Sequence, residues 1–266
     1  MRNLTPWAVS TAVGLVCLVG AVHPLQARAA TIVSVDFASG HTSGNLVGQQ
    51  SWAQTGSTTT NPIQVTSGIA VVGTSGQDVY KPFPGGALTP VAGEVLMTRL
   101  DFTPTAAQAT GDYFFHVSDP AGTTNNFYQR LFGRLVSGSL QLGLSTNSTT
   151  GNYGTGLYPL SQPITAVMKW SFITGATNDT IELFVNPVDP LNPSGAAYAS
   201  VTWSTSEPAT LAAVNFRQGN ASNAPSLAVT DLAIETVAVV PEPSAIVLLA
   251  AGCGALGCLV RRPGPG

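Results

Sequence analysis

The chain has 266 residues, of which ten are Lys or Arg and 13 are Asp or Glu, giving a formal net charge of −3. Charged residues make up 9% of the chain, against about 25% in ordinary soluble domains, which argues against a helical bundle or coiled coil. A hydrophobic fraction of 44% excludes a disordered chain. The few basic residues form no stripe that could neutralise phosphates, so no nucleic-acid partner is expected.

Residues 1–29 have the pattern of a secretory signal peptide. Arg2 provides a short basic start, the run from Ala8 to Val22 is apolar, and Ala27 and Ala29 fit the small-x-small rule for cleavage. The alternative is a retained membrane anchor, but the run is about 15 residues long and a spanning helix needs about 20. We therefore expect signal peptidase to cleave after Ala29 and the chain to be exported.

The C-terminal residues 241–266 have three distinct parts. Pro241, Glu242 and Pro243 precede an uncharged apolar segment at 244–260, and Arg261 and Arg262 follow it. Such a helix would be about 26 Å long, enough to cross a thin bilayer. By the positive-inside rule, the arginine pair stays in the cytoplasm and the body of the chain lies outside. The sequence predicts a transmembrane helix at 244–260 that holds an exported protein in the membrane.

The order of these parts resembles the PEP-CTERM sorting signal of exported bacterial proteins: a Pro-Glu-Pro motif, a transmembrane helix and a basic end. The resemblance covers residues 240–262. It implies recognition by a membrane-embedded exosortase and delivery to the cell surface or extracellular matrix. The alternative is a plain C-terminal anchor, in which Pro241 and Pro243 only break the chain before the helix.

Residues 30–240 form the predicted folded domain, and they contain no cysteine. Four of the ten basic residues lie in the two ends, together with Glu242 as the one acidic residue there, which leaves six basic and 12 acidic residues in the domain. A chain of about 210 residues can bury a core large enough to be stable without disulfides.

The hydrophobic pattern of this domain repeats every two residues. Ile181, Leu183 and Val185 are two residues apart and fall on one face of a strand. Turn-rich segments such as Asn147–Gly156 and Asn186–Pro193 separate such runs. The pattern predicts an all-β fold, a two-sheet antiparallel sandwich. The expected strands are 31–37, 68–72, 96–102, 113–118, 127–136, 139–144, 166–173, 180–185, 198–203, 211–217 and 227–237.

Several short phrases of the domain resemble LamG-like, concanavalin A-like jelly-roll domains of bacterial surface proteins. They include Asp36-Phe37, Gly48-Gln-Gln-Ser-Trp52, Asn61-Pro-Ile-Gln-Val65, Gly111-Asp-Tyr-Phe-Phe-His116, Arg130-Leu-Phe-Gly-Arg134, Leu183-Phe-Val-Asn-Pro187, Phe216-Arg-Gln-Gly219 and Thr230-Asp-Leu-Ala-Ile234. The resemblance implies a two-sheet jelly roll of about 12 to 14 strands, and because such domains include lectins, glycoside hydrolases and inert spacers, the fold leaves the function open.

The sequence offers no clear pair of catalytic carboxylates. A retaining glucanase needs an acid and a nucleophile about 5 to 5.5 Å apart. Asp179 and Glu182 are three residues apart and point to opposite faces of a strand, whereas Asp231 and Glu235 share a face. We expect no enzyme activity, with Asp231 and Glu235 as the best remaining candidates for chemistry.

No cofactor is expected either. His41 and His116 are the only histidines of the domain and neither has a second His or a Cys beside it, so no metal site is predicted. Asp119, Asn125 and Asn126 could supply oxygen ligands to Ca²⁺, but a solvated turn explains them as well.

Tyr153 and Tyr158 lie in the glycine-rich segment 151–159 and are the expected exposed aromatics. An exposed ring can stack on the apolar face of a sugar. The leading hypothesis is a non-enzymatic cell-surface or extracellular-matrix protein with a structural or adhesive role. The alternative is a carbohydrate-binding module that uses Tyr153 and Tyr158 on a polysaccharide of the envelope or matrix, and a glycoside hydrolase is less favoured.

Overall fold

Seventeen β-strands carry the fold of residues 29–238, the part of the chain that the computed structural model describes. Within these residues there is no helix that is long and apolar enough to span a membrane. The predicted signal peptide, apart from Ala29, and the predicted tail with its Pro241-Glu242-Pro243 motif and Arg261-Arg262 end lie outside the described residues.

The strands form two sheets, and every pairing within them is antiparallel. The nine-stranded sheet contains, in order, β15 (Ala199–Thr202), β14 (Thr180–Val185), β13 (Ile164–Ser171), β7 (Glu94–Ala106), β17 (Ser226–Ala238), β5 (Ile69–Val72), β4 (Gln64–Thr66) and β2 (Gly44–Asn45), with β1 (Ala29–Asp36) also paired to β17. The eight-stranded sheet contains β11 (Asn152–Tyr153), β10 (Ser139–Ser145), β9 (Phe127–Val136), β8 (Asp112–Ser118), β16 (Ala213–Phe216), β6 (Asp78–Pro82) and β3 (Ala53–Thr55), with β12 (Tyr158–Pro159) also paired to β10.

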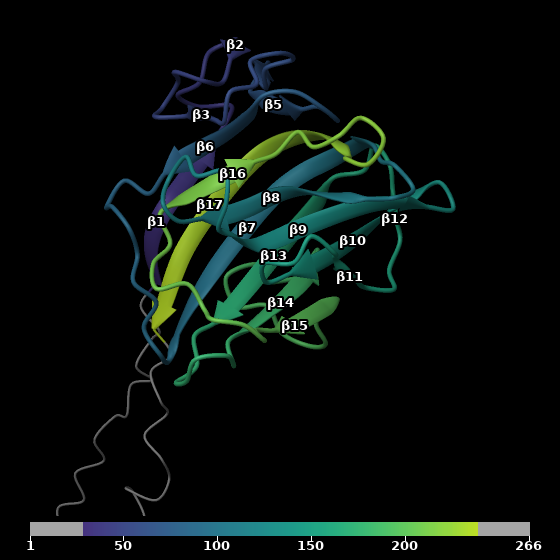
Figure 1. The fold of residues 1–266 in the computed structure, drawn as a ribbon. Coiled ribbons are helices and arrows are strands. Elements are labelled where there is room, and N and C mark those ends of the chain that lie inside the picture. Colours follow the sequence, from purple (N-terminus) through teal and green to yellow (C-terminus); the bar gives the residue numbers. More distant parts are fainter. Residues whose placement is uncertain (1–28, 239–266) are drawn as a thin grey trace, which may run out of the picture. The chain divides into compact units, whose positions relative to one another are not determined.

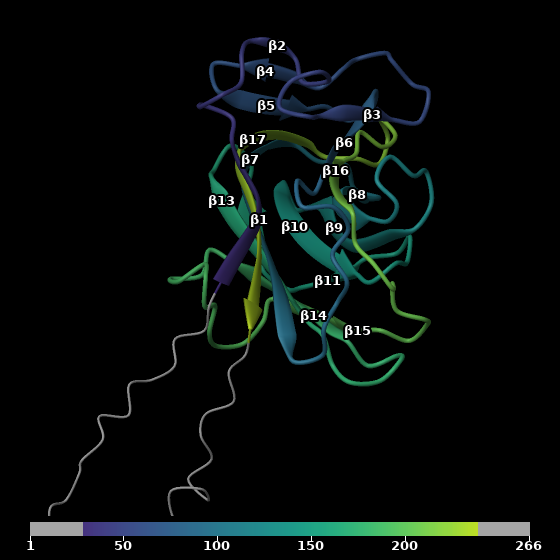
Figure 2. The same ribbon diagram turned by 90° about the vertical axis from the view of Figure 1, so that its left-hand side faces the viewer.

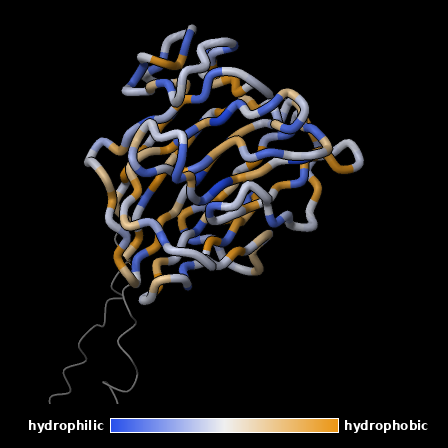
Figure 3. The backbone as a smooth tube through the Cα atoms, viewed as in Figure 1, coloured by the Kyte–Doolittle hydropathy of each residue, from blue (hydrophilic) through white to orange (hydrophobic). Residues whose placement is uncertain are grey.

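The two sheets pack face to face, as the two-sheet sandwich prediction requires. The eight-stranded sheet lies toward the viewer in Figure 1, and Figure 2 shows both layers from the side. Hydrophobic and hydrophilic residues alternate along the strands (Figure 3), because successive side chains of a strand point to opposite faces. One face of each sheet therefore builds the core between the layers.

Large aromatic side chains fill this core at two places. Trp170 of β13 stacks on Trp203 with ring centroids 4.8 Å apart, and both rings are buried. At the other place, Trp52 stacks on Phe216 of β16 at 5.4 Å. Fully burying one large apolar side chain contributes about 1.5 to 3 kcal/mol in transfer free energy, so these rings are a major favourable term in the folding of this domain.

β17 is the most extensively paired strand of the nine-stranded sheet. It is 13 residues long and pairs with β7 along its whole length, from Ser226 to Ala238. On its other side it pairs with β5 and then with β1, where Ala29 is opposite Val237. The chain therefore enters and leaves the described domain at the same end of one sheet.

All eleven predicted strands coincide with observed ones, within a few residues at each end. The prediction missed β2, β3, β4, β6, β11 and β12, which are two to five residues long. One of them corrects a specific expectation, since β11 interrupts the segment Asn147–Gly156 that was expected to form only turns. Strands of two or three residues are too short to show an alternating pattern, which needs at least four.

Candidate functional site

The outer face of the eight-stranded sheet, turned away from the core, carries a concentration of aromatic and basic side chains. On β9, Leu131 points into the core, so Arg130, Phe132 and Arg134 point outward. Across the strands, Tyr113 is the partner of Phe132, and Tyr153 is the partner of Gly143. We call this set of eight residues the arginine–aromatic face: Tyr113, His116, Phe127, Arg130, Phe132, Arg134, Tyr153 and Arg217.

The rings of the arginine–aromatic face form a continuous row. His116 and Phe127 have ring centroids 4.1 Å apart, and Tyr113 follows at 5.5 Å from His116. Phe132 lies 5.6 Å from Tyr113, and Tyr153 lies 6.3 Å from Phe132. All of these spacings are in the range in which aromatic rings attract one another. The row runs across β8, β9 and β11.

Each arginine of the face lies over one of these rings. The guanidinium carbon of Arg217 is 4.2 Å from the centroid of Tyr113, and that of Arg130 is 4.7 Å from the same centroid. Arg134 lies over Tyr153 at 4.0 Å. These distances are typical of cation–π contacts, which fix the plane of a guanidinium group.

The three arginines differ in their polar partners. Arg217 forms an ion pair with Asp112 at 2.7 Å. Arg134 donates from Nε to Oε1 of Gln141 at 2.7 Å. Arg130 is buried, donates from Nε to the Phe127 carbonyl oxygen at 3.3 Å, and has no partner for Nη1 among the described residues. Two of the three guanidinium groups therefore have no carboxylate partner within residues 29–238.

Burial controls the protonation of the titratable groups near this face. Burial, together with the nearby charges of Arg130 and Arg217, lowers the pKa of His116 well below its usual value, so the imidazole is neutral. Burial also raises the pKa of Asp78 to about 6. Near pH 6 this carboxyl group carries only part of its negative charge, and the face is more positive than a residue count indicates.

Only part of the face is accessible to a ligand. Phe127, Arg134, Tyr153 and Arg217 are half-buried, whereas Tyr113, His116, Phe132 and Arg130 are buried beneath or beside them. Buried rings that pack against accessible ones hold them in a single orientation. The accessible part therefore consists of two aromatic rings and two guanidinium groups in fixed positions.

Tyr153 and Tyr158, the predicted glycan-binding residues, lie at different places: Tyr153 is opposite Gly143 and Tyr158 is opposite Leu140. Both are half-buried rather than exposed, which corrects the expectation for the segment 151–159. Tyr153 lies on the arginine–aromatic face. Tyr158 pairs with Leu140 and packs against the core, and burial followed by the nearby Tyr198 raises its pKa to about 12. Of the two, only Tyr153 is placed to touch a ligand on this face.

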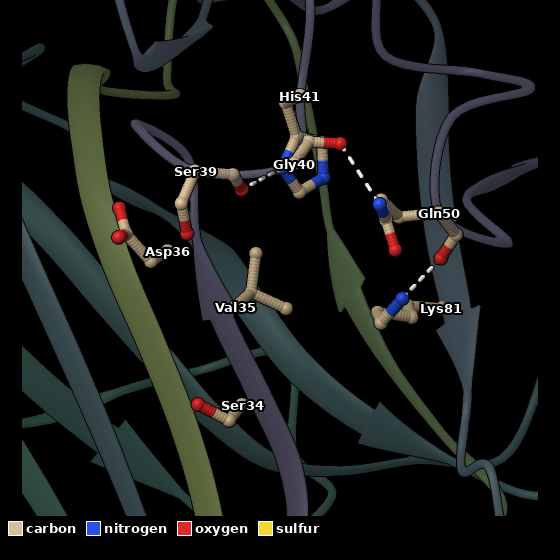
Figure 4. Close-up of a pocket in the computed structure, with 8 residues that line it drawn as sticks. All are labelled: Ser34, Val35, Asp36, Ser39, Gly40, His41, Gln50 and Lys81. Carbon is tan, nitrogen blue, oxygen red and sulfur yellow. Dashed lines mark hydrogen bonds between the residues drawn. The ribbon is translucent and has the colours of Figure 1, made fainter.

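A separate pocket of about 310 Å³ lies beside β1 and β6 (Figure 4). Lys81 donates from Nζ to the carbonyl oxygen of Gln50 there, and burial lowers its pKa. Figure 4 shows Asp36 beyond Val35, on the side away from Lys81. With one carboxylate in its lining, the pocket lacks the paired carboxylates of a glycosidase.

The candidate carboxylates for chemistry lie elsewhere. Leu232 and Ile234 of β17 point into the core, so Asp231 and Glu235 lie on the outer face of the nine-stranded sheet, away from the arginine–aromatic face. Burial, and then the charges of the neighbouring Asp101 and Asp36, raise the pKa of Asp231.

Asp179 and Glu182 are separated in the way that strand geometry predicts. Asp179 is buried, while Glu182 forms a half-exposed ion pair with Lys169 at 3.3 Å. Among residues 29–238, no group of three His, Cys, Asp or Glu side chains could hold a metal ion. Asp119, considered as a Ca²⁺ ligand, accepts a hydrogen bond from the Thr210 hydroxyl at 2.5 Å.

The sequence contained a signal for the arginine–aromatic face that composition alone did not reveal. In the run Phe127 to Arg134, arginine and phenylalanine alternate at the outward positions of a predicted strand. Arg217 could not be connected with them from the sequence, because it lies more than 80 residues away and reaches Tyr113 only through the pairing of β16 with β8.

No protein-family model and no curated protein sequence matches the chain. Solved structures do resemble it. The endo-1,3-beta-glucanase from Streptomyces sioyaensis is 13% identical with a TM-score of 0.50, covering 79% of this chain and 97% of the glucanase. At this identity, the likeness concerns the fold alone, and it agrees with the predicted two-sheet jelly roll.

Two further structures are similar at lower TM-scores. The CBM2 module of the evolved Dit from Lactobacillus casei BL23 phage J-1 is 11% identical with a TM-score of 0.45, covering 81% of this chain and 99% of the module. Lectin II from Ulex europaeus is 12% identical with a TM-score of 0.45, covering 78% of this chain and 99% of the lectin.

Proposed function

We propose that this chain is a non-enzymatic, exported bacterial protein that binds a polysaccharide of the cell envelope or matrix through its arginine–aromatic face. The observation that supports this proposal is the row of rings on the outer face of the eight-stranded sheet, with Arg130, Arg134 and Arg217 lying over it. A polysaccharide presents apolar ring faces for stacking and oxygen atoms for hydrogen bonds, which are the two kinds of contact that this face offers.

Export and sorting belong to the same proposal. Signal peptidase would remove the segment that ends at Ala27-Arg28-Ala29, and an exosortase would recognise Pro241-Glu242-Pro243, the membrane helix at 244–260 and Arg261-Arg262. The support comes from the sequence pattern alone. A protein delivered in this way meets surface polysaccharide at high local concentration, so a moderate affinity per domain is sufficient for adhesion.

We assign no catalytic role to the domain. Asp231 and Glu235 lie on the outer face of the nine-stranded sheet, whereas the aromatic row lies on the outer face of the eight-stranded sheet. A hydrolase of this fold would need its carboxylates beside the bound sugar. A structural and adhesive role therefore fits the distribution of side chains better than hydrolysis does.

Binding of the mature protein to immobilised polysaccharides tests the proposal. Tyr153→Ala and Arg134→Ala should each weaken binding at least tenfold, because each removes one half of a cation–π pair on the accessible part of the face. Lys169→Ala is the control, since Lys169 lies on the outer face of the other sheet, paired with Glu182. The arginine–aromatic face is rejected as a glycan site if both variants bind as tightly as the original protein. It is also rejected if the original protein binds no polysaccharide at millimolar concentration.

A further inference from the structure

We infer that the polysaccharide bound at the arginine–aromatic face is acidic, and that the accessible Arg134 contacts its carboxylate or sulfate groups, with Arg217 and the buried Arg130 adding positive charge beside it. This inference rests on the proposed function, because it names the chemical class of the ligand at the same site. It follows from the distribution of charge over the domain, from the partners of the three arginines and from their spacing.

The distribution of charge singles out this face. The domain from 30 to 240 has six basic residues and 12 acidic ones, yet three of the six basic residues lie together on the arginine–aromatic face. Of the others, Arg99 pairs with Asp101 at 3.1 Å and Lys169 pairs with Glu182 at 3.3 Å. The cluster of cations attracts anionic ligands to this face. The negative charge on the rest of the domain repels such ligands elsewhere.

Two of these three arginines have no anionic partner in the part of the chain that the structure describes. Within residues 29–238, neither Arg130 nor Arg134 has a carboxylate within ion-pair distance, and Nη1 of Arg130 is buried without a hydrogen-bond partner. A buried charge without a counter-ion costs free energy. An acidic ligand on the accessible Arg134 supplies a counter-ion there, and its charge also lowers the cost of the buried guanidinium of Arg130 nearby, whereas a neutral sugar supplies no counter-ion.

The spacing of the arginines favours an extended ligand over a single small anion. Arg130 and Arg134 are four residues apart on β9, which places their backbone positions about 13 Å apart, with Phe132 between them. Arg217 joins the row from β16 through its contact with Tyr113. A chain that carries acidic groups at intervals can place one group on Arg134 and another near Arg217, within the positive field of all three arginines.

A matched pair of polymers tests the acidic group directly. Polygalacturonate and its fully methyl-esterified form share one backbone, but only the first carries carboxylates. We expect the mature protein to bind polygalacturonate at least tenfold more tightly than the ester, with an affinity that falls as salt concentration rises. Dextran sulfate beside neutral dextran gives the same comparison for sulfate, and a preference for either charged polymer supports the inference.

Variants at Arg134 test whether the preference for the charged polymer depends on the arginine–aromatic face. Arg134→Gln should reduce the preference for the charged polymer at least tenfold, whereas Arg134→Lys should keep part of it because the charge remains. Lys169→Gln removes one positive charge from the opposite sheet and should leave the preference unchanged. A preference that Lys169→Gln lowers as much as Arg134→Gln does would mean that only net charge matters, and the inference would be wrong.

The outcomes separate the inference from the proposed function. Equal affinity for the charged and neutral polymers, with loss of both in Tyr153→Ala, overturns the acidic ligand and leaves the polysaccharide site in place. Absence of binding to every polysaccharide removes the proposed function itself. Equal binding to poly-L-glutamate, a polyanion without sugar rings, overturns the inference because the face would then recognise charge without recognising a polysaccharide.

Discussion

His116 is a titratable side chain whose protonation is disfavoured by its position in the arginine–aromatic face. Its ring is buried against Phe127 and Tyr113, and neither ring nitrogen has a hydrogen-bond partner among the described residues. Its surroundings are two aromatic rings and two arginines, and burial followed by the positive charges of Arg130 and Arg217 disfavours the imidazolium form.

This environment predicts a loss of stability in mild acid. Because the folded-state pKa of His116 is well below 6.5, the unfolded chain takes up a proton below pH 6.5 that the folded chain does not. This contribution to stability is present above the unfolded-state pKa of about 6.5 and falls by roughly 1 kcal/mol as the pH is lowered from 7.5 to 5.5. His116→Phe should remove this part of the pH dependence, as measured by urea unfolding at the two pH values.

A second substitution controls for changes in packing. His116→Gln also removes the titration, but it leaves a smaller side chain, so its absolute stability should differ from that of His116→Phe. Both variants should nevertheless show the same reduced difference between pH 7.5 and 5.5. If both keep the full difference of the original protein, the assignment to His116 is incorrect.

Asp179 and Glu182 provide a comparison between a buried and a half-exposed carboxylate. Asp179 accepts hydrogen bonds from Nε1 of the buried Trp170 at 3.1 Å and from the Ile173 amide at 2.7 Å. Asp179→Ala leaves two donors without this acceptor and should lower the free energy of unfolding by about 2 to 4 kcal/mol. Glu182→Ala removes only a surface ion pair and should cost less than about 1 kcal/mol. Similar losses in the two variants, measured by chemical denaturation, would contradict this reading.

At the scale of elements, β10 and β11 show how a short strand places one functional ring. Gly143 of β10 lies opposite Tyr153, and a Cβ atom built on Gly143 would lie 2.8 Å from Cδ1 of Tyr153. The absence of a side chain at Gly143 lets the tyrosine ring lie close to the sheet, beneath Arg134.

This contact predicts energetic coupling between the two positions. Gly143→Ala should lower the free energy of unfolding by about 1 to 3 kcal/mol, because the new methyl group overlaps the ring. In a Tyr153→Ala background the cost should largely disappear, since the overlapping atoms are gone. A double-mutant cycle by urea unfolding measures the coupling, and a coupling near zero would show that the ring moves away freely.

The long strands could be predicted from the sequence because they are half-buried. Thr180–Val185 and Phe127–Val136 are rich in apolar and aromatic residues, and both were predicted with the bounds that the structure shows. Short strands such as Asn152–Tyr153 exist only because a longer neighbour offers them hydrogen bonds. Their formation depends on tertiary contacts, which no local pattern encodes.

The candidate site was predicted only in part, for a related reason. Tyr153 was singled out from the sequence as a possible glycan-binding residue, and its accessibility was overestimated, because Arg134 and Phe132 pack against it. Tyr158 was grouped with it on sequence proximity, although the two strands place these rings on different sides of the sheet. The arginines are brought together by pairing across β8, β9 and β16, which requires the register of three strands.

At the scale of the whole molecule, the processing of both ends can be tested in one experiment. In a bacterium that contains an exosortase, we expect the intact mass of the mature protein to show loss of residues 1–29 and of the membrane segment that follows Pro241-Glu242-Pro243. In a host without exosortase, the protein should remain in the membrane fraction with Arg261 and Arg262 present. A mature chain that retains residues 241–266 in the first host would contradict the sorting proposal.

A variant of the tail separates sorting from simple anchoring. Pro241, Glu242 and Pro243 replaced together by alanine should leave the apolar segment able to insert but should prevent recognition by exosortase. Accumulation of this variant in the membrane of the exosortase-containing host is the expected result. Normal release of the variant would favour the plain anchor, in which the motif has no recognition role.

The position of β17 has a mechanical consequence. If the chain is held at the cell surface by its C-terminal end and binds a polysaccharide, as proposed above, a pulling force acts along its last strand. β17 is hydrogen-bonded to β7 over its 13 residues and to β1 and β5 on its other side. Because the bonds of an antiparallel pair lie perpendicular to the strand, such a force shears many of them together instead of opening them singly. The strand nearest the tail is therefore also the one best placed to resist tension.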